Sequence, residues 1–104
     1  MDSLKQMKVW VAELLNDEAI AVLDNVCQVD VKYKVPRDEQ LAMVRDYHAV
    51  IIRSETVVDK EFLDAAINLK IVGRGGSGLD NVDIDYATQK GVIVCNTPES
   101  NIVS

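Results

Sequence analysis

The sequence predicts an α/β domain built on an open, five-stranded parallel sheet. Its 104 residues are enough for one domain with a single core. Short apolar runs alternate with segments of helical periodicity in the order βαβαβαβαβ, which is typical of parallel strands joined by right-handed crossovers. The second strand carries polar residues at alternate positions, as an edge strand does, and this favours the strand order 2-1-3-4-5.

The first elements are a buried strand, a helix and the edge strand. Residues 8–12 form a nearly continuous apolar run, as expected of a strand buried on both faces. Asn16 or Asp17 can cap the helix that follows. The apolar stripe of that helix comprises Ala19, Ile20, Val22, Leu23 and Val26. In residues 29–33 apolar and polar side chains alternate, and Pro36 ends the pattern.

Three more helices and three more strands follow. A helix is predicted over residues 37–46. Asp59 can cap the next helix, and Asp83 can cap the last one, which Gly91 ends as the first residue beyond it. The apolar face of the middle helix comprises Phe62, Leu63, Ala66 and Ile67. The remaining strands are predicted over residues 49–52, 69–73 and 92–94.

The composition indicates a soluble globular protein, which we expect in the cytoplasm. The net charge of −6 argues against nucleic-acid binding as the main task. No apolar run approaches the length of a membrane span, and the first residues lack the pattern of a signal peptide. Cys27 and Cys95 have neither metal-site spacing nor a secretory context, so we expect reduced, buried thiols.

Four of the five glycines lie within residues 73–78, directly after the predicted fourth strand. Three of them match the G-x-G-x-x-G fingerprint of dinucleotide-binding proteins. That fingerprint opens a helix directly and is followed by an acidic residue at the end of the next strand. Here residues 79–82 intervene, and the next strand ends in Asn96. Three interpretations stay open: a dinucleotide site, a turn without a ligand, and a loop presenting N–H groups and Arg74 to an anion.

Polar groups gather where three neighbouring strands are predicted to end. They are Arg53 and Ser54 after the third strand, Arg74, Gly75 and Gly76 after the fourth, and Asn96 and Asn101 after the fifth. Because the carboxyl ends of parallel strands meet at one edge of a sheet, these groups can face one crevice. A guanidinium suits a carboxylate or phosphate, although a solvated surface arginine is the alternative in each case. The sequence therefore predicts a site for a small anion.

The other polar candidates favour structural roles. Asp80, Asn81 and Asp83 are residue types common in turns and helix caps. His48, the only histidine, precedes the third strand and so belongs to the edge opposite Arg53, which makes it a poor candidate for a catalytic base. The sequence shows no metal-ligating cluster and no catalytic triad, so we predict neither a metal site nor a catalytic residue in this chain.

Three stretches carry a resemblance to a known family. They are VIIRSET at residues 50–56, LKIVGRGGSGLDNVD at residues 69–83 and GVIVCNTP at residues 91–98. These stretches resemble the N-terminal part of the NAD-dependent D-2-hydroxyacid dehydrogenases, and the likeness extends over most of the chain from Val9 onward. The pair Arg53–Ser54 favours the phosphoglycerate branch of that family. Gly75 and Ser77 stand where the family usually has alanine and threonine, which are mild changes.

The resemblance implies a particular domain organisation. In that family a flavodoxin-like substrate domain, with helices on both faces of its sheet, is built from both chain ends around an inserted Rossmann NAD domain. Residues 1–104 would be the N-terminal part of the substrate-binding domain, and the NAD-binding domain would be absent from this chain. The turn at Thr97 and Pro98 would then open the helix that connects the two domains.

The resemblance also assigns roles by position. Arg53, Ser54, Arg74 and Asn101 would contact the substrate, Gly75 and Gly76 would donate backbone N–H groups to its carboxylate, and Ser77 would touch the nicotinamide end of NAD. The catalytic arginine, glutamate and histidine of the family come from the NAD domain, so His48 is not the family's histidine. We therefore expect a whole enzyme that oxidises a small phosphorylated 2-hydroxy acid with NAD, and a segment that is inactive alone.

Other function classes remain as alternatives. One is a dehydrogenase of the glyoxylate or hydroxypyruvate reductase type. Another is a stand-alone flavodoxin-like binding module such as a receiver domain, but that would need an aspartate where the third strand ends in Arg53. A third is a complete small dinucleotide-binding protein. We expect the whole enzyme to be a homo-oligomer, the segment to be a monomer, and neither nucleic acid nor a membrane to be a partner.

Overall fold

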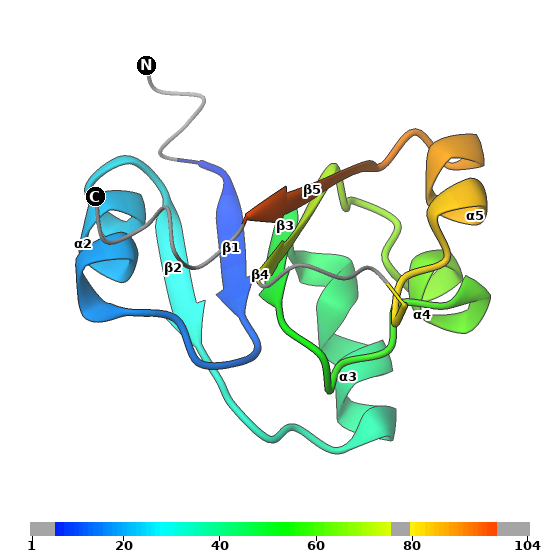
Figure 1. The fold of residues 1–104 in the computed structure, drawn as a ribbon, viewed down its shortest axis with the longest axis horizontal. Coiled ribbons are helices and arrows are strands. Elements are labelled where there is room, and N and C mark those ends of the chain that lie inside the picture. Colours follow the sequence, from blue (N-terminus) through cyan, green and yellow to red (C-terminus); the bar gives the residue numbers. More distant parts are fainter. Residues whose placement is uncertain (1–5, 76–79, 98–104) are drawn as a thin grey trace.

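The computed structural model describes residues 6–75 and 80–97. All five strands run parallel in one sheet of order β2-β1-β3-β4-β5, which confirms the predicted fold class and strand order (Figure 1). In chain order the elements are β1 (Lys8–Val11), α2 (Asp17–Val26), β2 (Gln28–Val31), α3 (Arg37–Met43), the 3-10 turn η1 (Val44–Asp46), β3 (Ala49–Ile52), α4 (Lys60–Ala65), β4 (Ile71–Gly75), α5 (Ile84–Gln89) and β5 (Ile93–Thr97).

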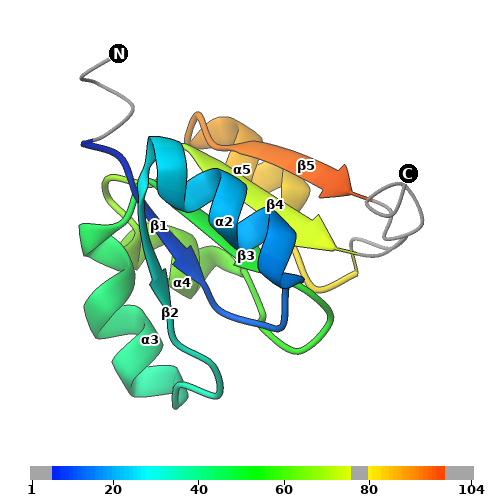
Figure 2. The ribbon, with the colours of Figure 1, turned by 90° about the vertical axis from the view of Figure 1, so that its left-hand side faces the viewer.

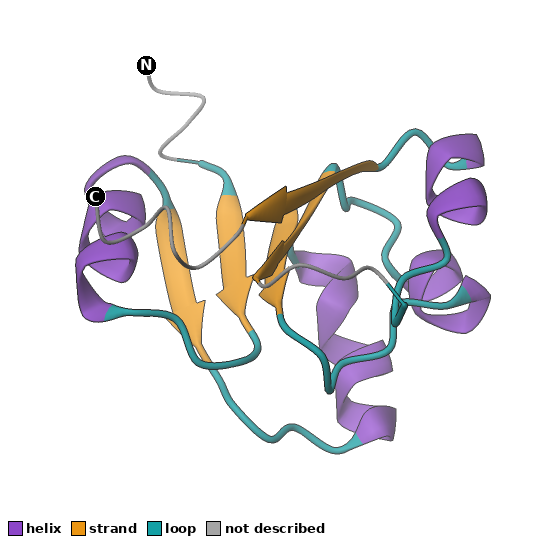
Figure 3. Cartoon of the chain, in the orientation of Figure 1, coloured by secondary structure: helices purple, strands orange, loops and turns teal. Residues whose placement is uncertain are grey.

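Helices cover both faces of the sheet, but unequally. Among the described helices, α2 lies on one face, and α3, α4 and α5 lie on the other (Figures 1, 2 and 3). The three-helix face holds the main core, where the rings of Trp10 and Phe62 are fully buried with centroids 6.4 Å apart. A smaller cluster around Val9, Val11 and Ala49 packs beneath α2. Close packing on both faces makes β1 and β3 a rigid base for the chain that follows them.

The helix caps match the sequence signals. The side chains of Asn16, Asp59 and Asp83 accept hydrogen bonds from backbone N–H groups three residues further on, at 2.8 to 3.0 Å. Each bond satisfies a donor that the first turn of a helix leaves without a partner. After α5 the backbone turns at Gly91, whose φ of 80° is the left-handed conformation that favours glycine.

The last two strands begin and end later in the chain than their apolar runs indicated. β4 was predicted over residues 69–73 but spans Ile71–Gly75, and β5 was predicted over residues 92–94 but spans Ile93–Thr97. The N–H of Leu69 bonds to the carbonyl of Ala66, so Leu69 still belongs to the turn after α4. Pairing between neighbouring strands, and not the apolar character of the residues, determines where both strands end. Arg74 therefore lies inside the sheet, where it pairs with Asn96.

Three side chains predicted to face the core are exposed instead. Val22 of α2 is 65% exposed because it lies about 100° around the helix from Leu23, which packs on the sheet. Ile67 is 66% exposed because α4 ends at Ala65 and the chain leaves the helical path before it. Val26, in the last turn of α2, is also exposed.

The expectation of two buried thiols is wrong for Cys95 and only partly met by Cys27. Cys27 is half-buried at the end of α2, whereas Cys95 is exposed in β5. Ile93, two residues before Cys95 and on the same face of the strand, is 60% exposed. Both positions lie on the edge strand, and α2 packs against the distant strand β2. Both cysteines are unpaired, as expected.

None of the described helices is long and apolar enough to cross a membrane. The longest, α2, has 10 residues.

Candidate functional site

The predicted meeting of strand ends at one edge is found for the described residues, but of the predicted site residues among them only Arg53 and Ser54 line the cleft described below, and Arg74, Gly75 and Asn96 do not. Ile52, the last residue of β3, pairs with Arg74 of β4, which pairs in turn with Asn96 of β5. Arg53 and Ser54 directly follow β3 at this carboxyl edge. Three of the predicted site residues, Gly76, Ser77 and Asn101, lie outside the described residues.

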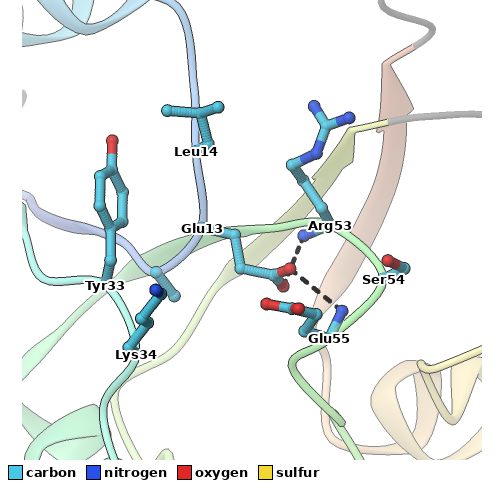
Figure 4. Close-up of a pocket in the computed structure, with 8 residues that line it drawn as sticks. Glu13, Leu14, Tyr33, Lys34, Arg53, Ser54 and Glu55 are labelled. Atoms are coloured by element: carbon cyan, nitrogen blue, oxygen red, sulfur yellow. Dashed lines mark hydrogen bonds between the residues drawn. The ribbon is translucent and has the colours of Figure 1, made fainter.

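An open cleft of about 420 Å³ lies beside Arg53 and Ser54 (Figure 4). Its walls come from the segments that follow β1, β2 and β3, which are neighbours in the sheet. The lining residues are Ala12, Glu13, Leu14, Tyr33, Lys34, Arg53, Ser54 and Glu55. Lys34 reaches the cleft from a backbone with φ of 57°, a left-handed conformation that is costly for a residue with a side chain.

Glu13 organises one wall of this cleft. Its carboxylate accepts hydrogen bonds from the N–H groups of Arg53 at 2.7 Å, Glu55 at 3.0 Å and Thr56 at 3.0 Å. Figure 4 shows the carboxylate directed at this segment, residues 53–56, which we call the 53–56 loop. Glu13 is only 9% exposed. Burial raises the pKa of its carboxyl, but the three donors outweigh burial and hold the pKa below its ordinary value.

Asn81 holds the same loop from the side of β4. Its amide nitrogen donates to the carbonyls of Arg53 and Thr56, each at 2.6 Å. Its side-chain oxygen accepts from Nε of Arg74 at 2.9 Å. The N–H of Val58 in turn donates to the Asn81 carbonyl at 2.8 Å. One carboxamide therefore joins the 53–56 loop to the fourth strand, a more specific role than the turn predicted for it.

The two arginines occupy different environments. Arg74 is 8% exposed, and its Nη1 donates to the carbonyl of Gly75 at 2.9 Å. Arg53 is half-buried at the cleft, and Figure 4 shows its guanidinium directed away from the Glu13 carboxylate. Arg53 packs along Gly75, since a Cβ added there would lie 3.5 Å from Nη1 of Arg53. Arg74 thus supports the edge from within, while Arg53 lies at the cleft; whether either contacts a substrate stays a prediction.

The described part of the glycine segment does not have the layout of a dinucleotide site. Gly73 and Gly75 belong to β4, and residues 80–83 precede α5, which begins only at Ile84. Val82 instead forms a bridge with Val58. The helix N-terminus that would receive a pyrophosphate is therefore separated from the glycines, as the sequence indicated.

His48 lies at the opposite edge of the sheet, as expected. Its Nδ1 accepts a hydrogen bond from the N–H of Lys8 at 3.0 Å, beside the beginning of β1. Within residues 6–75 and 80–97, no three histidine, cysteine or acidic side chains are grouped so that they could hold a metal ion.

Sequence reasoning missed Glu13, Leu14, Tyr33, Lys34 and Glu55 as parts of the site. Glu13 had one available signal, because an acidic residue directly after a buried apolar strand needs a hydrogen-bond partner if it is itself buried. Tyr33 and Lys34 also had a signal, because the predicted strand order already places the end of the second strand at the same edge as the end of the third.

The chain was compared with known protein families, proteins and structures. Residues 9–104 match the family described as D-isomer specific 2-hydroxyacid dehydrogenase, catalytic domain. A protein named D-3-phosphoglycerate dehydrogenase from Archaeoglobus fulgidus is 48% identical over 99 residues, which cover 94% of this chain and 19% of that relative. The protein of the same name from Mycobacterium tuberculosis is 48% identical over 98 residues, covering 92% and 18%.

A solved structure supports the same placement. The NAD+-bound 3-phosphoglycerate dehydrogenase of Entamoeba histolytica superimposes with a TM-score of 0.81 at 29% identity, covering 92% of this chain and 34% of that one. The chain spans about a fifth of the length of the curated relatives that it matches. The family match over nearly the whole chain, together with this superposition, shows that the chain belongs to the D-isomer specific 2-hydroxyacid dehydrogenases.

Proposed function

We propose that this chain is the N-terminal part of the substrate-binding domain of an enzyme that oxidises 3-phosphoglycerate to 3-phosphohydroxypyruvate with NAD, a step toward serine. Identities of 48% to relatives named D-3-phosphoglycerate dehydrogenase support this substrate. The main structural support for the proposal is the position and bonding of the 53–56 loop. It presents Arg53 and Ser54 at the carboxyl edge of the sheet, and both Glu13 and Asn81 hold its backbone.

The task of this chain in the proposed reaction is to bind and orient the substrate. Arg53 offers a planar fork of donors to a carboxylate or phosphate, and the Ser54 hydroxyl and the N–H groups of Gly75 and Gly76 add directed donors. The Arg74 guanidinium, buried beside Gly75, adds positive charge behind them. Asn101 completes the proposed set. Holding the reacting carbon in the right geometry supplies a large part of the rate enhancement in such reactions.

The charges around the cleft indicate how an anion is held. Lys34 and Arg53 are balanced by Glu13 and Glu55, so the lining residues carry no net charge. Three N–H groups of the 53–56 loop already face the Glu13 carboxylate. Attraction must therefore come from individually directed donors, chiefly the guanidinium of Arg53, and not from a broad positive field.

NAD would accept the hydride, and we assign its binding mainly to a domain outside this chain. The separation of the described glycines from the N-terminus of α5 supports that assignment. Ser77 is the one residue of this chain that we propose to contact NAD, at its nicotinamide end. The same domain would supply the general base, so the chain alone should be inactive. We further propose a cytoplasmic enzyme that is homo-oligomeric when whole, with this segment monomeric on its own.

A segment exchange tests the proposal. Residues 9–104 would replace the matching segment of the Archaeoglobus fulgidus relative, and NADH formation would be measured with 3-phosphoglycerate and with unphosphorylated glycerate. We expect activity within about tenfold of the parent enzyme, and a KM raised about 100-fold by Arg53→Gln. Arg45→Gln, at an exposed arginine of η1, is the matched control and should leave KM unchanged.

Two results would contradict the proposal. One is a folded hybrid that lacks activity with 3-phosphoglycerate. The other is a hybrid that prefers unphosphorylated glycerate, which would favour the glyoxylate or hydroxypyruvate reductase type.

A further inference from the structure

We propose that Glu13 is a positioning residue for substrate binding, because its carboxylate fixes the backbone of the loop from which Arg53 and Ser54 meet the substrate. This inference rests on the proposed function for the identity of the ligand. It adds a residue that touches no substrate and lies 40 residues before Arg53 in the chain.

The geometry gives Glu13 control over the whole loop. One carboxylate oxygen accepts from both Arg53 and Thr56, and the other accepts from Glu55. The donors flank Ser54 on both sides, so the loop is curved around the carboxylate with Ser54 at its outer side. Consecutive N–H groups that converge in this way form a cradle for an anion. The Glu13 carboxylate occupies this cradle, so the three N–H groups are not available to the substrate. The side chains of the loop are then the groups that can contact the substrate.

Glu13 itself has a rigid base. It directly follows Val11 and Ala12, both buried, and the N–H of Ala12 donates to the carbonyl of Ile51 at 2.9 Å. β1 is a central strand, paired with β2 on one side and β3 on the other. A loop tied to such a strand is held in one conformation before the substrate arrives, and less free energy is then lost on binding.

Charged and titratable groups face Glu13 from two segments. Lys34 and Tyr33 come from the segment after β2, and Arg53 and Glu55 come from the 53–56 loop. Gln40 of α3 also lines the space beside Glu13, but it does not titrate. Glu55 is the other acidic side chain that lines this space, so it is the neighbour against which a change at Glu13 has to be compared.

The test compares Glu13→Gln with Glu13→Asp, Glu55→Gln and Glu39→Gln. Glutamine keeps the shape of Glu13 but replaces one acceptor oxygen with a donor, and aspartate keeps the charge. Glu55→Gln checks the neighbouring acid, and Glu39→Gln makes the same change at an exposed position of α3. Amide hydrogen exchange in the 104-residue chain reports on the 53–56 loop. KM and kcat of the hybrid enzyme report on how the 53–56 loop contributes to substrate binding and turnover.

For Glu13→Gln we expect about tenfold faster exchange of the Arg53, Glu55 and Thr56 amides, with the amides of β4 unchanged. In the hybrid enzyme, KM for 3-phosphoglycerate should rise about tenfold while kcat changes less than about twofold. Glu13→Asp should recover part of both effects. Glu55→Gln and Glu39→Gln should keep loop exchange at the wild-type rate.

Two outcomes would overturn the proposal. Unchanged exchange in the 53–56 loop would show that Glu13 does not hold it, whatever the substrate is. Faster exchange with an unchanged KM, in a hybrid whose wild-type form is active, would limit Glu13 to a role in stability. A wild-type hybrid that is inactive with 3-phosphoglycerate would instead refute the proposed function, and with it the substrate named here, while the exchange data would still report on the loop.

Discussion

The two edges of the sheet are held together in different ways. At the amino edge, where strands begin, backbone groups bond to backbone groups: Gln28 to Met7 at 2.9 Å, His48 to Lys8 at 2.9 Å, and Ile93 to Lys70 at 2.8 Å. At the carboxyl edge, where strands end, the side chains of Glu13 and Asn81 bond to the backbone of the 53–56 loop. The amino edge is therefore held mainly by backbone pairing, with His48 as one side-chain contact, whereas the 53–56 loop at the carboxyl edge depends on two side chains.

This difference suits the proposed site, which lies at the carboxyl edge. A loop held by backbone pairing must follow the direction of the sheet, whereas a loop held by side chains can curve away from it and expose residues such as Arg53. Such a loop is more sensitive to substitution, because removing one of the two side chains leaves buried donors or acceptors without partners. Four substitutions test this difference between the two edges.

Asn81→Ala should be the most destabilising of the four. It removes the bonds to the carbonyls of Arg53 and Thr56 and the acceptor for the buried guanidinium of Arg74. We expect a loss of about 3 kcal/mol in the free energy of unfolding, measured by urea denaturation. The control is Asn68→Ala, which removes one exposed bond to the carbonyl of Arg45 and should cost about 0.5 kcal/mol. Equal effects of the two changes would contradict the comparison.

Glu13→Gln should cost about 2 kcal/mol at pH 7, and the cost should depend on pH. The pKa of Glu13 is lower in the folded protein than in the unfolded chain, so its contribution is present above the ordinary glutamate pKa and is lost as pH falls through the lower, folded value. Urea denaturation should therefore show wild type and variant converging below about pH 4. Asp59 also has a lowered pKa, but it is present in both proteins and cancels in the difference. A difference that stays constant down to pH 2 would contradict this account.

His48→Ala tests the amino edge. The Nδ1 of His48 accepts from the N–H of Lys8, but the backbone bond from His48 to the Lys8 carbonyl stays in place. We expect a loss of about 1 kcal/mol in urea denaturation and no change in hydrogen exchange of the 53–56 loop. A loss as large as that of Asn81→Ala would show that the amino edge also depends on single side chains.

Gly75→Ala should have the smallest effect, within about 0.5 kcal/mol. The nearest atoms to an added Cβ are Nη1 of Arg53 at 3.5 Å and Cγ of Arg53 at 3.6 Å, which are ordinary contacts. Gly73→Ala is the matched comparison, since its Cβ would lie 3.0 Å from Cδ1 of Ile51 and should cost about 1 kcal/mol. The reverse order, measured by urea denaturation, would contradict the packing described at Gly75.

The features that were predicted correctly from the sequence are those that depend on neighbouring residues or on the order of the elements. Asn16, Asp59 and Asp83 each bond to a backbone group three residues away, so a short pattern is enough to find them. The alternation of elements and the edge character of β2 were enough for the strand order. Arg53 and Arg74 were correctly brought to one edge, because parallel topology alone requires it.

The missed features depend on tertiary distances. Glu13 bonds to residues 40 to 43 positions away, and its place after a buried strand indicates the need for a partner but does not identify which residues supply it. The buried position of Arg74 follows from the end of β4 at Gly75, two residues later than predicted, where the strand pairs with β3 and β5. Arg74 therefore bonds within the protein where the sequence suggested a side chain facing the cleft, and Asn81 was recognised as structural without its partners being identified.

We propose that the carboxyl edge carries a preformed half-site for a small anion. An amide chemical-shift titration of the 104-residue chain with 3-phosphoglycerate, with inorganic phosphate and glycerate as comparisons, tests it most directly. We expect saturable shifts at Arg53, Ser54 and Gly75, larger for 3-phosphoglycerate than for either comparison ligand, with the amides around His48 unchanged. Shifts at the amino edge, or equal shifts with all three ligands, would contradict it.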